Sequence, residues 1–112
     1  MIESPQKMML IFLDETDMWH DGHLYAAIVM TLERHGIAGA TVNQGLMGYG
    51  RHRRIHRKGL FGLSDDKPVT IMAVDSEAKL RTVAPIISAM LREGLMLMID
   101  AEVFQSPPPE AV

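Results

Sequence analysis

Two parts of the chain repeat one pattern: a strand-like apolar run, a helical segment with one apolar face, a glycine, and a second apolar run. The apolar face of the first helical segment, 24–35, recurs at the i, i+3, i+4 and i+7 spacing of an α-helix. Its members are Tyr25, Ile28, Val29 and Leu32. Gly36 follows as a stop for that helix, and Gly94 follows the second helix. The repetition indicates a fold built from two βαβ halves.

The pattern predicts four strands, over 7–13, 41–49, 68–74 and 95–104. Asp21 is the expected cap of the first helix, and Asp75 or Ser76 is the expected cap of the second. Pro85 is expected to kink the second helix, because proline cannot donate to the preceding turn. The order βαββαβ predicts an α+β fold of the ferredoxin-like, split βαβ type. Such a fold has a four-stranded antiparallel sheet with two helices on one face.

The chain has 112 residues, which suits one domain with one core. We expect that domain over 7–104, between a flexible N-terminus at 1–6 and a disordered tail at 105–112 that contains three consecutive prolines. Several strands, 95–99 above all, are apolar on both sides, so both faces of the sheet need cover. Two helices cover one face. We therefore expect oligomerisation, as a homotrimer, to cover the second face.

Composition restricts where the protein works. Cysteine is absent, so disulfides and thiolate metal sites are excluded, and a reducing compartment is favoured. No signal pattern opens the chain, and no apolar run approaches the roughly 18 residues of a membrane span. We therefore expect a cytoplasmic protein.

Charge is distributed unevenly along the chain. Five of the 11 Lys and Arg lie between Arg51 and Lys58, inside a long loop that also contains Gly48 and Gly50. The rest of the chain carries a formal charge of −8. A basic loop on an acidic body predicts a local anion site, in which guanidinium groups hold phosphate and the glycines let backbone N–H groups approach it. An RNA-recognition sheet needs several exposed aromatic residues, for which Phe12 and Phe104 are the only candidates, and its signature Lys/Arg-Gly-Phe stretch is missing, so no nucleic-acid partner is expected.

Alternatives remain open for this loop. It can equally be a solvated segment that docks onto acids of a neighbouring subunit. His52 and His56 have the i, i+4 spacing of metal ligands on a helix, but five surrounding cations oppose a metal, and these histidines can instead donate to phosphate. Ser64 has no base partner, and Asp65–Asp66 fits a turn, so no enzyme is expected.

Several motifs in sequence order resemble a known family. They are LIFLDETD, LYAAIVMTLERHGIAGATV, GYGR, SDDKPVTIMAVD and REGLMLMIDAEV, and they extend over about 7–104. This set is similar to the PII-like family called domain of unknown function 190, or UPF0166, and more distantly to the PII nitrogen-regulatory proteins. The resemblance implies a ferredoxin-like homotrimer that binds adenine nucleotides in clefts between subunits, at the base of a mobile effector loop. It also implies a membrane transporter or channel as a possible target.

The candidate effector-binding residues combine the resemblance with the basic loop. They are Thr41, Gly48, Gly50, Arg51, His52, Arg53, Arg54 and His56. The turn at 92–95 lacks the lysine that holds phosphate in PII proteins, so cations of the loop must serve instead. The first hypothesis is a PII-like trimeric regulator of a small anionic effector, with adenine nucleotide as the leading candidate. The second is a structural or metal-handling trimer that uses its histidines and binds no nucleotide.

Overall fold

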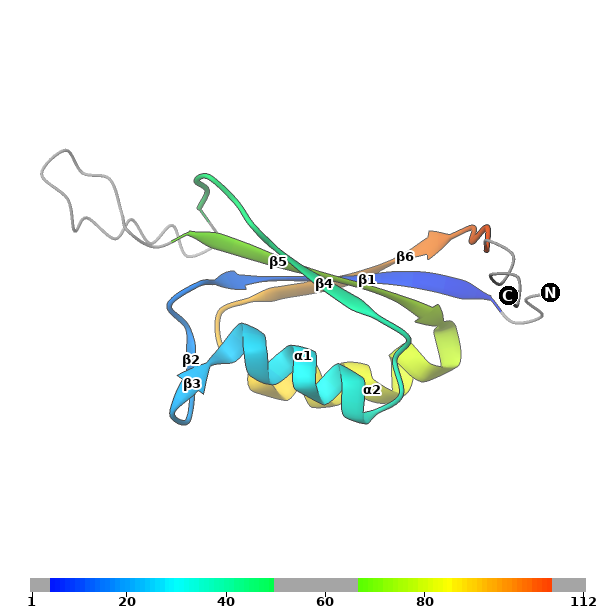
Figure 1. Cartoon of the computed structure of the whole chain (residues 1–112), viewed down its shortest axis with the longest axis horizontal. Helices are drawn as coiled ribbons and strands as arrows, with labels where there is room; N and C mark the ends of the chain where they lie inside the picture. The colour runs from blue at the N-terminus through cyan, green and yellow to red at the C-terminus, as the bar shows by residue number, and fades with distance from the viewer. Residues whose placement is uncertain (1–4, 50–66, 106–112) are drawn as a thin grey trace, which may run out of the picture.

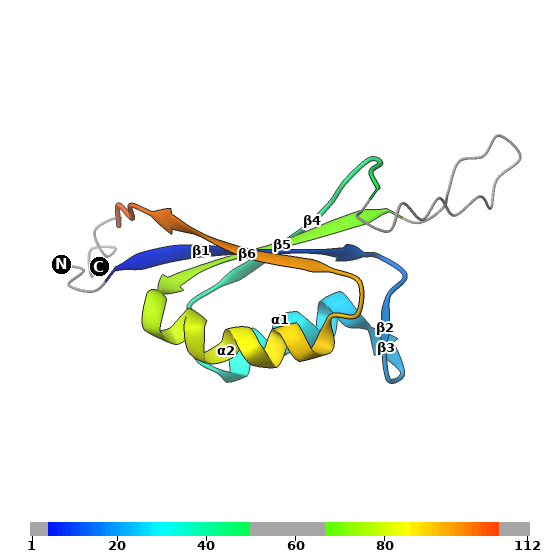
Figure 2. The same ribbon diagram turned by 180° about the vertical axis from the view of Figure 1, so that it is seen from behind.

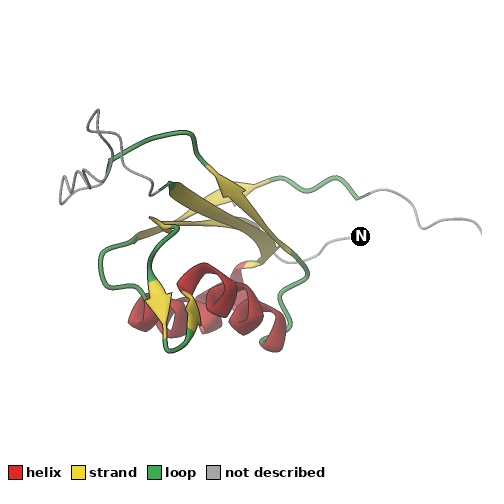
Figure 3. Ribbon diagram, turned by 60° about the vertical axis from the view of Figure 1, so that its left-hand side comes forward, coloured by secondary structure: helices red, strands yellow, loops and turns green. Residues whose placement is uncertain are grey.

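A computed structural model describes residues 5–49 and 67–105 of the chain. Along the sequence the elements are β1 (Gln6–Asp14), β2 (Met18–Trp19), β3 (Gly22–His23), α1 (Leu24–Arg34), β4 (Ala40–Gln44), β5 (Pro68–Ser76), α2 (Glu77–Met90) and β6 (Leu95–Ala101). The long strands form one antiparallel sheet in the order β4-β5-β1-β6, while β2 and β3 form a separate hairpin. Both helices lie on the same side of the sheet (Figures 1 and 3). The predicted ferredoxin-like fold is confirmed.

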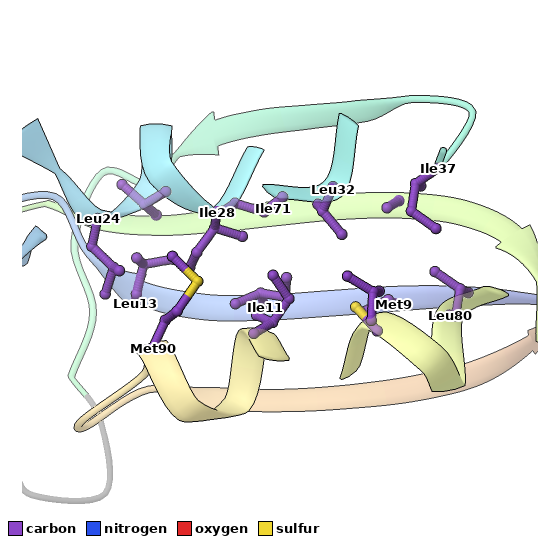
Figure 4. Packing of buried hydrophobic residues seen from close by; sticks show 14 residues of the cluster. Met9, Ile11, Leu13, Leu24, Ile28, Leu32, Ile37, Ile71, Leu80 and Met90 are labelled. Carbon is purple, nitrogen blue, oxygen red and sulfur yellow. The ribbon is translucent and has the colours of Figure 1, made fainter. Parts of the chain in front are cut away.

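The core lies between the sheet and the two helices. Alternate residues of the two central strands face the helices, so that Ile11 of β1 lies opposite Ile71 of β5, and both are fully buried. Ile28 of α1 and Leu80 of α2 close the layer from the helix side and are also fully buried (Figure 4). Burying one such side chain stabilises the fold by about 1.5–3 kcal/mol relative to leaving it exposed.

The opposite face of the sheet is apolar and carries no element among the described residues. Its rows follow from the register, in which Leu10 of β1 lies opposite Met72 of β5 and Leu97 of β6. In the next row Phe12 lies opposite Leu95, which is 51% exposed. We call this surface the open face; its apolar members are Met8, Leu10, Phe12, Met72, Val74, Leu95, Leu97 and Ile99. The expectation that the helices cover only one face therefore holds within the protomer.

Two strands are shorter than the sequence predicts. The strand expected at 41–49 ends at Gln44, because the next ladder position is Pro68, which has no N–H to donate. The strand expected at 95–104 ends at Ala101, which pairs with Gln6, the first residue of β1. The strands expected at 7–13 and 68–74 are confirmed, and both extend slightly further.

The first helix starts at Leu24, as expected, but its cap differs from the prediction. Asp21 does not cap α1, because His20 and Asp21 form the two-residue turn of the β2–β3 hairpin, with His20 at φ 55°. The cap position is His23, which makes no side-chain capping bond. No hairpin was predicted here, because strands of two residues leave no apolar periodicity to read.

The second helix confirms one cap prediction. The hydroxyl of Ser76 accepts a hydrogen bond from the backbone N–H of Lys79, whereas Asp75 accepts from Ala38 instead. The helix ends at Met90 and not at Gly94. Pro85 lies inside α2 with an exposed ring.

Candidate functional site

One end of the main sheet contains the last residues of β1 and β4 and the first residues of β5 and β6. The chain leaves the sheet there before residues 50–66 and re-enters it after them. The register places Asp14 beside Pro68, Gln44 beside Val69 and Phe12 beside Leu95. Figures 1 and 2 show this end from both sides, with the β2–β3 hairpin next to it. We call it the loop end. In the sequence, the residues predicted to bind an anion lie on or next to the segments that meet at the loop end.

The loop has two stems, an outgoing stem at 44–48 and a return stem at 67–68, and the two lie in close contact. The N–H of Gly45 donates to the carbonyl oxygen of Pro68 at 2.7 Å. A Cβ at position 45 would lie only 2.8 Å from Cγ of Pro68, so only glycine fits at this approach. A Cβ at Gly48 would lie 3.4 Å from the same Cγ. Gly45 therefore marks a close approach between the two stems.

Glu15 connects these stems to the end of β1. Its N–H donates to the carbonyl oxygen of Lys67 at 2.9 Å, which holds the return stem. Its carboxylate accepts a hydrogen bond from the Nε2 amide of Gln44 at 2.7 Å, which holds the outgoing stem. Sequence reasoning missed both residues. No signal in the sequence pairs them, because they are 29 positions apart, one in the turn after β1 and the other on β4, and these two strands do not neighbour each other.

The histidines beside the loop end make local contacts. Nδ1 of His23 lies 3.2 Å from the carbonyl oxygen of Glu15, and because a carbonyl only accepts, this nitrogen carries the hydrogen. The same ring stacks on Tyr25 at 5.0 Å. His20 meets Trp19 edge-on, also at 5.0 Å. Among the described residues no three His, Asp or Glu lie close enough together to hold a metal ion.

The turn between α2 and β6 closes the loop end on its far side. A Cβ at Gly94 would lie 2.6 Å from the carbonyl oxygen of Phe12, so this turn presses directly against the backbone of β1. Arg92 and Glu93 are exposed in the same turn. At the opposite end of the sheet, Lys7 pairs with Asp100 at 2.5 Å and lowers the pKa of that carboxyl below its ordinary value.

The predicted site residues divide into two groups. Thr41 and Gly48 are described, and both are exposed. Thr41 lies opposite Met72, four residues along β5 from the Pro68 that Gly48 approaches. At about 3.3 Å per residue, this places Thr41 about 13 Å from Gly48 within one protomer. The others lie outside the described residues; they are Gly50, Arg51, His52, Arg53, Arg54 and His56.

No helix in the described part of the chain has the length and apolar character that a membrane crossing requires. The longest, α2, has 14 residues, whereas a span needs about 20.

The sheet order and the one-sided helix layer define a ferredoxin-like fold, which the chain shares with solved PII-like proteins. The solved structure of CPII, a nitrogen regulatory PII-like protein from Thiomonas intermedia K12 bound to ADP, AMP and bicarbonate, matches with a TM-score of 0.58. The match covers 88% of each chain at 25% sequence identity.

The chain belongs to the DUF190 family, described as an uncharacterized ACR, whose match extends over residues 6–103. A UPF0166 protein of Methanocaldococcus jannaschii is 35% identical over 100 residues, which cover 88% of this chain and 92% of the relative. A UPF0166 protein of Aquifex aeolicus is 29% identical over 98 residues, with the same coverage. The resemblance inferred from the motifs is thus confirmed.

Proposed function

We propose that this protein is a PII-like regulator that binds a small anionic effector, an adenine nucleotide, at the base of its loop. The observation that carries the proposal is the match over 88% of both chains to a PII-like protein solved with ADP and AMP. The loop itself supplies five cations on a chain that otherwise carries −8, so an anion is drawn to this part of the protein and repelled elsewhere.

We also propose a homotrimer as the working form. The open face presents eight apolar side chains on three neighbouring strands, with Leu95 and Ile99 51% and 46% exposed in the protomer. A contiguous apolar surface of this kind is typical of protein–protein interfaces. In such a trimer, we propose, cations of one copy act on a ligand held by the next.

We propose that the loop carries the physiological role. Contacts between phosphate and loop cations can order the loop, and an ordered loop can be recognised by a target protein. We propose a membrane transporter or channel as that target and the cytoplasm as the place of action. The family resemblance supports the target, and the cysteine-free sequence supports the compartment.

Titration calorimetry with ATP, ADP and AMP tests the effector proposal. We expect binding to the wild type and at least tenfold weaker binding after Arg51→Ala with Arg54→Ala. Each charge-assisted contact contributes about 1.5–3 kcal/mol, and about 1.4 kcal/mol corresponds to one decade of affinity. Added salt is expected to weaken binding further if the site is exposed.

The matched control removes the same charge from the helix layer, with Arg34→Ala and Arg81→Ala. Both side chains are exposed, and both lie on helices away from the loop stems. We expect this variant to bind as the wild type does. No binding of any adenine nucleotide to the wild type would refute the effector proposal, and equal losses in the two double variants would refute the site.

A further inference from the structure

The turn after β1 reaches both stems of the loop, although only one of them belongs to a neighbouring strand. In the sheet order β5 lies between β1 and β4. Because neighbouring strands are about 4.8 Å apart, β1 and β4 are separated by roughly 10 Å. The carboxylate of Glu15 and the amide of Gln44 bridge this gap with one hydrogen bond of 2.7 Å. We call this bond the clasp.

The clasp spans the start of β5, where the return stem enters the sheet. The backbone N–H of Glu15 holds Lys67 at 2.9 Å, while the Gly45 N–H holds Pro68 at 2.7 Å. Glu15 on one side and Gly45, the residue after β4, on the other thus both hold the return stem. The result is a closed ring of contacts that runs from β1 through Lys67, Pro68 and Gly45 to Gln44 and back to Glu15.

Glu15 is itself held in place by a tightly bonded turn. The carboxylate of Asp14 accepts from the N–H and the hydroxyl of Thr16, both at 2.9 Å. The carboxylate of Asp17 accepts from the N–H of Asp14 at 3.1 Å, and the carbonyl of Asp17 accepts from Leu24 at the start of α1. The clasp is therefore anchored through this turn to the first helix.

Charge alone does not explain a carboxylate at this position. A negative group beside the proposed anion site weakens effector binding by repulsion. Glu15 therefore fits there only if its hydrogen bond to Gln44 raises effector affinity by more than its charge lowers it. Glutamate reaches Gln44 and accepts its amide hydrogen, and a glutamine at the same position has the same length and a carbonyl acceptor without the charge. The substitution Glu15→Gln can therefore separate the effect of the hydrogen bond on affinity from the effect of the charge.

We propose that Glu15 is a positioning residue of the loop base: its clasp with Gln44 holds the two stems at a fixed separation, on which effector affinity depends. The affinity part of this inference rests on the proposed function, whereas the clasp does not. Glu15 acts through the stems and needs no contact with the effector.

The experiment compares Glu15→Ala, Gln44→Ala, Glu15→Gln and the double alanine variant by amide exchange at Gly45 and by calorimetry with ADP. We expect faster Gly45 exchange and about three- to tenfold weaker ADP binding in each alanine variant, as loss of one hydrogen bond predicts. The double variant is expected to be no worse than either single variant, because the two residues share one bond. Glu15→Gln is expected to keep Gly45 protection and to bind ADP at least as tightly as the wild type.

Glu33→Ala is the matched control, because it removes one exposed acid from α1, away from the stems. It is expected to leave Gly45 exchange unchanged. If Glu15→Ala tightens ADP binding as Glu15→Gln does, charge alone governs affinity and the positioning role is overturned. If Gly45 exchange is unchanged in both single alanine variants, the clasp is overturned. If the wild type binds no adenine nucleotide, the proposed function fails and the affinity role with it, and Gly45 exchange alone then decides the clasp.

Discussion

Gly94 shows how a single missing side chain can decide local packing. Its position has no room for a Cβ, since that atom would lie 2.6 Å from the carbonyl oxygen of Phe12. Phe12 cannot move aside easily, because it pairs with Thr70 on one side and with Leu95 on the other. The sequence had suggested Gly94 as a helix stop, but α2 ends four residues earlier. Its role is the close approach of the last turn to β1.

We expect Gly94→Ala to destabilise the protein by about 1–3 kcal/mol, the usual cost of forcing an extra carbon into a packed site. Chemical denaturation at one fixed protomer concentration measures the change, because assembly makes stability depend on concentration. Gly39→Ala is the control, as a Cβ there meets nothing within 4 Å. We expect that control to be neutral or stabilising by up to about 1 kcal/mol. Equal midpoints for the two variants would contradict the packing account.

Among the helices, α2 shows how much of an element is specified locally. Ser76 lies before the first turn with extended backbone, and its hydroxyl accepts from Lys79 at 3.3 Å. Glu77 adds a negative charge in the first turn, where the helix dipole favours it. These are short-range features, and they explain why the start of α2 was predicted correctly. The start of α1 has no such cap: the helix begins at Leu24 as expected, but Asp21, its predicted cap, lies in the β2–β3 turn.

We expect Ser76→Ala to cost about 1 kcal/mol of stability, because the N–H of Lys79 loses its partner. Ser88→Ala in the same helix is the matched control. Ser88 is exposed in the interior of α2, where alanine has the higher helix propensity, so we expect no loss. Thermal or urea unfolding of both variants checks this, and a loss of the same size in the control would point away from capping.

At the scale of the whole molecule, the open face is an apolar surface that no described element of the protomer covers. Leu97 belongs to it, opposite Leu10. Met98, the next residue, lies opposite the fully buried Met9 and packs against the core. A charge at Met98 is therefore expected to disrupt the fold, whereas a charge at Leu97 tests assembly.

We expect Leu97→Asp to weaken the homotrimer and shift the protein towards monomer at micromolar concentration, because an unpaired charge in an apolar interface is costly. Light scattering coupled to size exclusion measures the mass. Met30→Asp is the control: Met30 is 50% exposed on α1, outside the open face, so its variant should keep the wild-type mass. A wild type that is monomeric, or a Leu97→Asp variant with unchanged mass, would refute assembly through this face.

The sequence by itself determined the order and type of the long elements, the βαββαβ plan and the family. Helix periodicity, the Ser76 cap and the apolar strand runs are local patterns, and they act over a few residues. Only the tertiary structure decided the rest. The ends of β4 and β6 depend on what their neighbours can pair with, namely Pro68 and Gln6. Which alternate residues form the open face depends on where the helices pack. The clasp joins Glu15 and Gln44 across an intervening strand, and no short-range pattern can encode a contact between residues that only the completed sheet brings together.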